Sequence, residues 1–201
     1  MTEPVERLAP ARAESVAQAV ASWKAAVLDL FGGGWSFAWV GPRDHQDWHR
    51  DVASVMALRV SDPRGWYSVD FAPESAESRG GAAAPFLPWS SEQLTASLFE
   101  VGPLSAAQLL VALKGEWYQA ANIPDFENRK DELLRSSRRI LSRFGPDASF
   151  FTNASEARNN PDADLLNPAA EWECLSDFTT DCGLVAVSAT EVGVFWAFWE
   201  D

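Results

Sequence analysis

The chain has 201 residues, and its 29 Asp and Glu against 16 Lys and Arg give a formal net charge of −13. A field of this sign argues against nucleic acid and anionic membrane surfaces as partners, because neutralisation of phosphates dominates such binding. With 47% hydrophobic residues the chain can bury a core, and its length fits one domain over residues 1–201.

The first part of the chain predicts a helix followed by strands. Residues 11–31 place apolar side chains three and four positions apart, which is typical of a helix with one buried face. Residues 35–40 alternate aromatic with smaller residues, which predicts a strand with an aromatic face. Residues 51–60 and 65–71 predict two more strands, joined by the hairpin loop 61–65. These three strands indicate an antiparallel meander.

A loop and three helices are expected in the middle of the chain. Residues 72–89 are rich in Ala, Gly, Pro, Ser and Glu and lack periodicity, so we expect a mobile surface loop there. The predicted helices cover residues 90–101, 105–121 and 125–144. Ser90 with Gln93, and Ser105 with Gln108, have the spacing of a capping box, which marks the start of the first two helices.

Two of these helices carry side chains of interest. Helix 105–121 is expected to bury Trp117 together with its leucines. Helix 125–144 carries the only basic cluster of the chain, formed by Arg135, Arg138, Arg139 and Arg143. Such a cluster can bind an anionic ligand, or it can pair with acidic residues of the same protein, for which the C-terminal segment is the obvious source.

The end of the chain predicts a second group of strands. They cover residues 148–152, 171–178, 183–189 and 193–200. The last two are expected to form a hairpin around Thr190-Glu191-Val192. Runs of strands separated by runs of helices favour an α+β fold, in which an antiparallel sheet, made of the N-terminal meander and the C-terminal hairpin, packs against about four helices.

Negative charge is concentrated toward the C-terminus. From Asp147 onward there are eleven acidic residues and one arginine, so this segment supplies −10 of the net −13. The acids are interleaved with aromatic residues, a combination that can hold a basic protein, although a moderately acidic chain can also owe its charge to solubility alone. The candidate partner-binding residues are Asp177, Asp181, Glu191, Glu200, Trp48 and Trp199.

Both histidines of the chain lie in one polar segment, which forms an alternative site. His45 and His49 are four residues apart, so on a helical turn they would share a face, with Asp44 nearby. The spacing is similar to half of a zincin motif, but Gln46 stands where that motif has its glutamate base. A solvated polar loop therefore explains the segment better, and we predict no metal and no cofactor.

The two cysteines do not form a metal or catalytic pattern. Cys174 and Cys182 are separated by seven residues, and there is no second pair for a zinc site. Buried thiols in a reducing compartment are the preferred interpretation, and a disulfide across neighbouring strands is the alternative. The chain also lacks the Gly-x-Ser-x-Gly nucleophile motif.

The terminal segment, from Asp177 to Asp201, ends in aromatic and acidic residues after the predicted hairpin. In this it resembles the tails of bacterial immunity proteins that neutralise polymorphic or contact-delivered toxins. The resemblance covers roughly the last 25 residues and includes no diagnostic motif. It implies a cytoplasmic α+β protein whose acidic face occludes a basic toxin, often a nuclease.

The leading hypothesis is thus a non-enzymatic module that binds a basic protein. In its most specific version, the module neutralises a toxin. The alternative is a small metal-dependent or cysteine/histidine enzyme, or a small-molecule binder. Its pocket would lie against the aromatic face of Trp35, Phe37 and Trp39, with His45 or His49 at the rim. A structural subunit of a larger assembly is a third option. We expect a cytoplasmic location, since the sequence shows neither a signal-peptide pattern nor an apolar run of about 20 residues; it indicates no particular oligomeric state.

Overall fold

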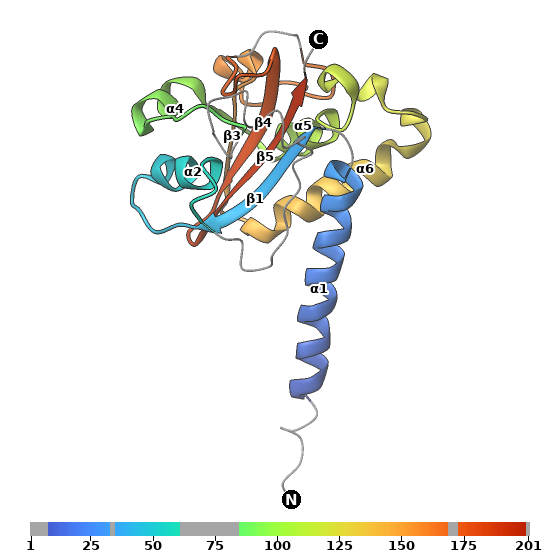
Figure 1. The fold of residues 1–201 in the computed structure, drawn as a ribbon. Helices are drawn as coiled ribbons and strands as arrows, with labels where there is room; N and C mark the ends of the chain where they lie inside the picture. Colours follow the sequence, from blue (N-terminus) through green and yellow to red (C-terminus); the bar gives the residue numbers. More distant parts are fainter. Residues whose placement is uncertain (1–7, 33–34, 61–84, 169–172, 200–201) are drawn as a thin grey trace, which may run out of the picture.

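A five-stranded antiparallel sheet forms the centre of the molecule (Figure 1). The computed structural model describes residues 8–32, 35–60, 85–168 and 173–199. In spatial order the strands are β1 (Ser36–Pro42), β5 (Glu191–Trp199), β4 (Thr180–Val187), β3 (Ser149–Thr152) and β2 (Phe99–Val101). All four neighbouring pairs are antiparallel.

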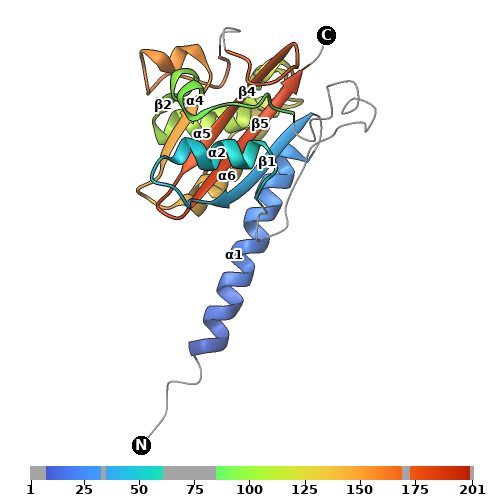
Figure 2. The same cartoon turned by 60° about the vertical axis from the view of Figure 1, so that its left-hand side comes forward.

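Helices cover both faces of this sheet. One face carries α1 (Leu8–Phe31), α5 (Pro103–Ala112) and α6 (Phe126–Leu141), and the other carries α2 (Trp48–Met56) and α4 (Ser91–Ser97) (Figure 2). The first half of α1 extends beyond the sheet and the other helices in both views. Helices and an antiparallel sheet occupy separate layers, so the predicted α+β class is confirmed.

The two faces have separate hydrophobic cores because successive strand residues point to opposite sides. On β4, Cys182 and Leu184 belong to the core beneath α1, α5 and α6, whereas Val185 belongs to the core beneath α2 and α4. On β5, Phe195 belongs to the core beneath α1, α5 and α6, and Trp196 belongs to the core beneath α2 and α4. Both side chains are fully buried. Since both faces are covered, these strands read as continuous apolar runs in the sequence.

Some short 3-10 turns complete the described fold. They are Glu116–Tyr118, Ala120–Asn122, Ser142–Phe144 and Ser155–Arg158. The first two stand where the sequence predicted a continuation of helix 105–121, which ends at Ala112 instead. Gly115 lies between α5 and the first of these turns, and only glycine fits there, since a Cβ at this position would lie 2.0 Å from the backbone oxygen of Gln119.

The predicted meander is wrong in its second strand. Residues 48–56 form α2, in which Val52, Val55 and Met56 are buried at helical spacing. The β-branched valines favoured a strand, but burial of this stripe against β1 and β5 outweighs that weak preference. The predicted strand 65–71 lies outside the described residues. The predicted strand 171–178 is replaced, in its described part, by bends with one isolated bridge between Phe86 and Ser176.

The other boundaries were closer to the structure. Helix α4 opens with the predicted capping box of Ser90 and Gln93, whereas α5 begins at Pro103, so Ser105 is not its N-cap. Residues 99–101, predicted as helical, form the edge strand β2. The predicted loop 72–89 is described only from Pro85 on, where Phe86 is buried in the core beneath α2 and α4.

Candidate functional site

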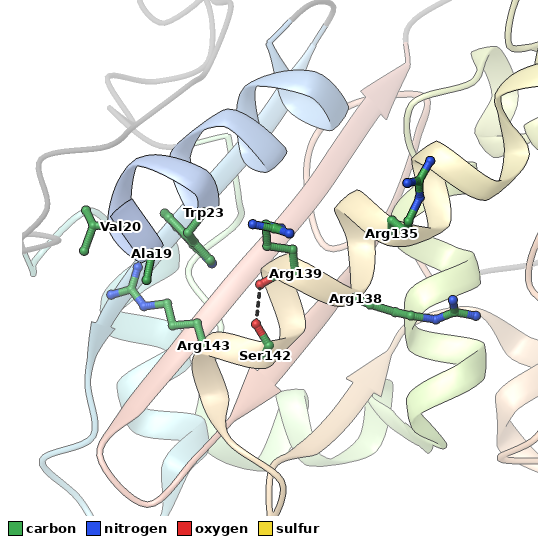
Figure 3. A pocket seen from close by; sticks show the side chains of 8 residues that line it. All are labelled: Ala19, Val20, Trp23, Arg135, Arg138, Arg139, Ser142 and Arg143. Carbon is green, nitrogen blue, oxygen red and sulfur yellow. Dashed lines mark hydrogen bonds between the residues drawn. The ribbon is translucent and has the colours of Figure 1, made fainter. Parts of the chain in front are cut away.

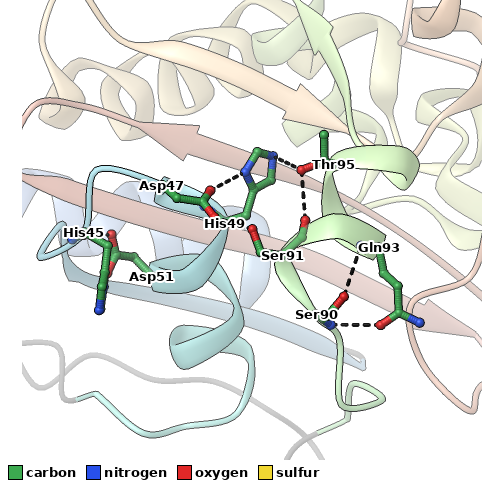
Figure 4. Close-up of polar contacts among 8 residues, drawn as sticks. All are labelled: His45, Asp47, His49, Asp51, Ser90, Ser91, Gln93 and Thr95. Atoms are coloured by element: carbon green, nitrogen blue, oxygen red, sulfur yellow. Dashed lines mark hydrogen bonds and ion pairs between the residues drawn. The ribbon is translucent and has the colours of Figure 1, made fainter.

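The histidine segment forms the start of α2 and its contact with α4 (Figure 4). Asp47 is the N-cap of α2 and accepts a hydrogen bond from the backbone N–H of His49. Its carboxylate also lies 2.8 Å from Nδ1 of His49 and accepts a hydrogen bond from the hydroxyl of Ser91 on α4. On the other side of the imidazole, Nε2 of His49 lies 3.3 Å from Oγ1 of Thr95. The cluster therefore joins two helices.

The carboxylate of Asp47, the imidazole of His49 and the hydroxyl of Thr95 follow one another in the order of a catalytic triad. The hydroxyl, however, does not donate to the imidazole. Oγ1 of Thr95 donates to the backbone oxygen of Ser91 across 2.9 Å, so its proton points along α4 and not toward His49. Hydrogen bonds from Ser91 and His49 lower the pKa of Asp47, which keeps this carboxylate charged as a helix cap. The geometry supports a structural connection between α2 and α4.

The second histidine makes a separate pair. Nδ1 of His45 lies 2.5 Å from Oδ1 of Asp51, and Oδ2 of Asp51 accepts the backbone N–H of His45. Asp51 is buried on α2, whereas Asp44 is exposed. Within the described parts of the chain, no group of three His, Cys, Asp or Glu residues is placed to hold a metal ion.

Trp48, a predicted partner-binding residue, is half-buried and stacks against two other rings. Its ring centroid lies 3.7 Å from that of His49 and 4.4 Å from that of Phe151 on β3, and both pairs are stacked. The indole thus anchors α2 on the sheet. Of the aromatic strand face predicted as a pocket wall, Phe37 is fully buried and packs edge-on against Phe86.

Asp181, another predicted partner-binding residue, is fully buried, which is a correction to the sequence-based expectation. Its carboxylate accepts five hydrogen bonds, from the backbone N–H groups of Leu175 and Ser176, the hydroxyl of Ser176, Nε1 of Trp196 and the side-chain amide of Asn153. Burial raises the pKa of Asp181, and the bonds from Ser176 and Trp196 oppose that effect. This acid organises the segment before β4 and cannot contact a partner.

The remaining predicted acids are scattered. Glu191 forms a bidentate ion pair with Arg143, with two N–O distances of 2.9 Å, so the predicted internal pairing of the arginine cluster is found for one arginine. Asp177 is exposed. Glu200 lies outside the described residues. Of the described acids predicted as partner contacts, Asp177 is thus exposed, Asp181 is buried and Glu191 is paired, so these three do not form one acidic face.

The cysteines are both free thiols. Cys182 is buried in β4, and burial raises its pKa well above the ordinary value. Burial also raises the pKa of Cys174, whose sulfur lies 3.8 Å from the backbone oxygen of Thr179. A thiolate is therefore disfavoured at both positions, contrary to what a cysteine nucleophile requires.

Exposed aromatic side chains gather where β1 begins and β5 ends. Trp35 precedes β1 and is 42% exposed, Trp117 follows α5 and is 41% exposed, and the half-buried Trp199 ends β5. Trp35 and Trp199 line a common cleft of about 490 Å³, and the rings of Trp117 and Trp199 are 5.3 Å apart. We call these three residues the tryptophan patch.

Local backbone geometry holds Trp117 at the surface. Trp117 and Tyr118 both have positive φ, 57° and 56°, a conformation that is uncommon for bulky residues. Tyr118 is buried, and its hydroxyl donates to the backbone oxygen of Thr180 across 2.9 Å. Burial raises the pKa of Tyr118, so the phenol remains a donor. The buried tyrosine turns the preceding tryptophan outward.

The other two members of the patch are fixed by the sheet. The backbone oxygen of Trp35 accepts a hydrogen bond from the N–H of Phe198, which extends the pairing of β1 with β5. The ring of Trp35 packs edge-on against Phe178 at 5.2 Å, and Phe178 packs against Phe198 at 4.9 Å. The patch is therefore built on paired strands and a strained turn, which position its indoles.

The sequence analysis named two members of this patch, in different hypotheses. Trp199 was among the predicted partner-binding residues and Trp35 was expected in the wall of the alternative pocket, whereas Trp117 was expected to be buried. The prediction for Trp117 is wrong because α5 ends five residues before it. The one available signal was Gly115, a helix-terminating residue two positions earlier.

Comparisons with known proteins give no independent guide to this site. No protein-family model matches the chain, and no match was found among curated proteins or solved structures. Among the described helices, none combines the length and the apolar character needed to cross a bilayer.

Proposed function

We propose that this chain is a non-enzymatic module that binds a basic protein through the tryptophan patch. The observation that supports this most strongly is the grouping of Trp35, Trp117 and Trp199 beside one cleft, with two of the indoles more than 40% exposed. Tryptophan is enriched among the residues that dominate interface energies, and an indole presents a large rigid surface at a low entropic cost.

The charge of the partner is inferred from the acids next to the patch. Glu116 is exposed and directly precedes Trp117, and Asp177 is exposed and directly precedes Phe178, on which Trp35 packs. The cleft is also lined by Lys114 and Arg129, but both of these contact Asp29: Lys114 donates to its backbone oxygen and Arg129 pairs with its carboxylate. The chain as a whole has a net charge of −13. Such a field speeds association with a cationic protein and makes the association rate depend on salt.

The sharpest form of this proposal is a cytoplasmic immunity protein that occludes the active site of a basic toxin. The acid-and-aromatic ending of the chain, similar to immunity-protein tails, is its sequence support. Occlusion requires a rigid surface that is formed before binding, and the strand-anchored position of Trp35 and Trp199 meets this requirement.

The test is a comparison of binding by matched variants. A partner captured from the native host at low salt would be identified by mass spectrometry and its affinity measured by calorimetry. We expect Trp117→Ala and Trp199→Ala each to weaken binding about tenfold or more. Leu104→Ala is the control, because Leu104 is a 59% exposed apolar residue on α5 outside the patch.

Three outcomes would decide against the proposal. Equal affinity of the patch variants and the control would show that the patch is not the contact surface. If the partner is basic but its association rate does not depend on salt, charge attraction does not drive the binding, contrary to this proposal. An enzymatic activity that His49→Ala abolishes and Trp117→Ala leaves intact would instead support the alternative enzyme.

A further inference from the structure

A groove between α1 and α6 is lined by positively charged side chains, whereas the chain as a whole is acidic. Its volume is about 610 Å³, within the range of small-molecule sites. The groove is lined by side chains from α1, from α6 and from the turn that follows α6 (Figure 3). Those from α1 are Ala19, Val20 and Trp23, and the others are Arg135, Arg138, Arg139, Ser142 and Arg143. None of these residues lines the cleft beside the tryptophan patch.

One arginine belongs to the framework of this groove. The guanidinium group of Arg143 lies 4.5 Å from the ring centroid of Trp23 and forms the ion pair with Glu191. Nε1 of Trp23 donates to the backbone oxygen of Ile140 across 3.1 Å, which fixes the indole on α6. These contacts hold the floor of the groove in place without a ligand.

The other three arginines are exposed, and none has a carboxylate within ion-pair distance among the described residues. Nε of Arg135 donates to the backbone oxygen of Asp131, and Arg139 donates to the hydroxyl of Ser22. The side chain of Arg138 makes no hydrogen bond or ion pair with a described residue. In Figure 3, Arg139 reaches toward α1, while Arg135 and Arg138 point away from it.

Three positive charges lie close together on this part of α6. Arg135 and Arg139 are four residues apart on one helix, and Arg135 and Arg138 are three apart, spacings at which like charges repel. The chain has acids in excess, yet these three guanidinium groups are not neutralised by the described ones. An external anion would relieve the repulsion and form charge-assisted hydrogen bonds with each group.

We propose that the groove binds a small multivalent oxyanion, a compound with two or more carboxylate or phosphate groups. Arg135, Arg138 and Arg139 would supply the positive charge that binds these anionic groups. The apolar side chains of Ala19 and Val20 would contact the organic part of the ligand. The site is independent of the proposed binding of a basic protein, because it has the opposite charge and different residues.

Calorimetric titration with citrate and with tripolyphosphate tests this proposal and distinguishes carboxylate from phosphate recognition. We expect one of them to bind at one site per chain, and Arg138→Gln to weaken that binding about tenfold. Arg50→Gln is the matched control, because Arg50 is an exposed arginine on α2 and its replacement changes the net charge equally. The triple variant Arg135→Gln, Arg138→Gln, Arg139→Gln should abolish binding.

Circular dichroism of each variant shows whether it is folded. Absence of binding by both probes at about 1 mM would overturn the proposal, as would equal weakening in Arg138→Gln and Arg50→Gln. Binding of poly-glutamate that depends on Arg138, with neither small anion bound, would assign the groove to an acidic polypeptide and would also contradict it.

Discussion

Nε and one terminal nitrogen of Arg143 each donate a hydrogen bond of 2.9 Å to the carboxylate of Glu191. The arginine follows α6 and the glutamate opens β5, so this pair connects the helical layer with the terminal hairpin. The side chain of Arg143 is only 2% exposed, which distinguishes the pair from the surface ion pairs that contribute little to stability.

Replacement of Glu191 by alanine should therefore be strongly destabilising. It removes the carboxylate acceptor of a buried guanidinium group, and we expect the free energy of unfolding to fall by about 3 kcal/mol. Urea denaturation measures this change. Glu127→Ala, which removes an exposed acid from α6, should change stability by less than about 0.5 kcal/mol. Equal effects of the two substitutions would show that the pair behaves as a surface ion pair.

The hydrogen-bond network of Asp181 gives a second prediction. In Asp181→Asn, an amide group would face donors that now point at a carboxylate, so at least one buried donor would lose its acceptor. We expect a loss of about 1–3 kcal/mol in the free energy of unfolding. Asp177→Asn makes the same chemical change at an exposed position four residues earlier and should be nearly neutral. Similar unfolding midpoints for both variants would contradict the burial of Asp181.

The contact between α2 and α4 should depend on pH through Asp47. Its folded-state pKa is lowered by hydrogen bonds from Ser91 and His49, so it lies below the unfolded value of about 3.9. A lowered carboxyl pKa contributes stability above the unfolded value, and this contribution is lost as the pH falls through the folded value.

We therefore expect Asp47→Ala to be less stable than the wild type by about 1 kcal/mol near neutral pH, the typical cost of losing an N-cap. This difference should shrink below about pH 4. Thermal unfolding at a series of pH values measures it, with Asp44→Ala as the control at an exposed aspartate. If the stability difference between the wild type and Asp47→Ala grew toward acid pH, the pKa of Asp47 would be raised by folding, contrary to this prediction.

Alkylation tests the state of the two thiols. Burial raises the pKa of both cysteines, which lowers the fraction of reactive thiolate at any given pH. In the native protein we expect Cys182 to be unreactive toward iodoacetamide and the half-buried Cys174 to react slowly. Both should react fully in concentrated guanidinium chloride, as peptide mass spectrometry would show. Rapid native labelling of Cys182 would contradict its burial.

Local sequence patterns identified most of the regular elements. The helical spacing of apolar residues in 11–31 was sufficient to predict α1, because burial of one face of a helix leaves a periodic pattern. The apolar run near the end of the chain was sufficient to predict β5, which is buried on both faces. One exception is α2, whose nine residues carry two valines in the buried stripe. Its periodicity spans little more than two turns, too short to outweigh the strand preference of the valines.

The candidate site could not be predicted in the same way. The sequence by itself determined the charge of the chain, the α+β class and the clustering of acids near the C-terminus. Only the tertiary structure decided that Asp181 is buried, that Glu191 is paired and that Trp117 faces the solvent. Whether a side chain lies inside or outside depends on contacts between residues far apart in sequence, as between Tyr118 and Thr180 or Arg143 and Trp23, and a local pattern carries no information on such contacts.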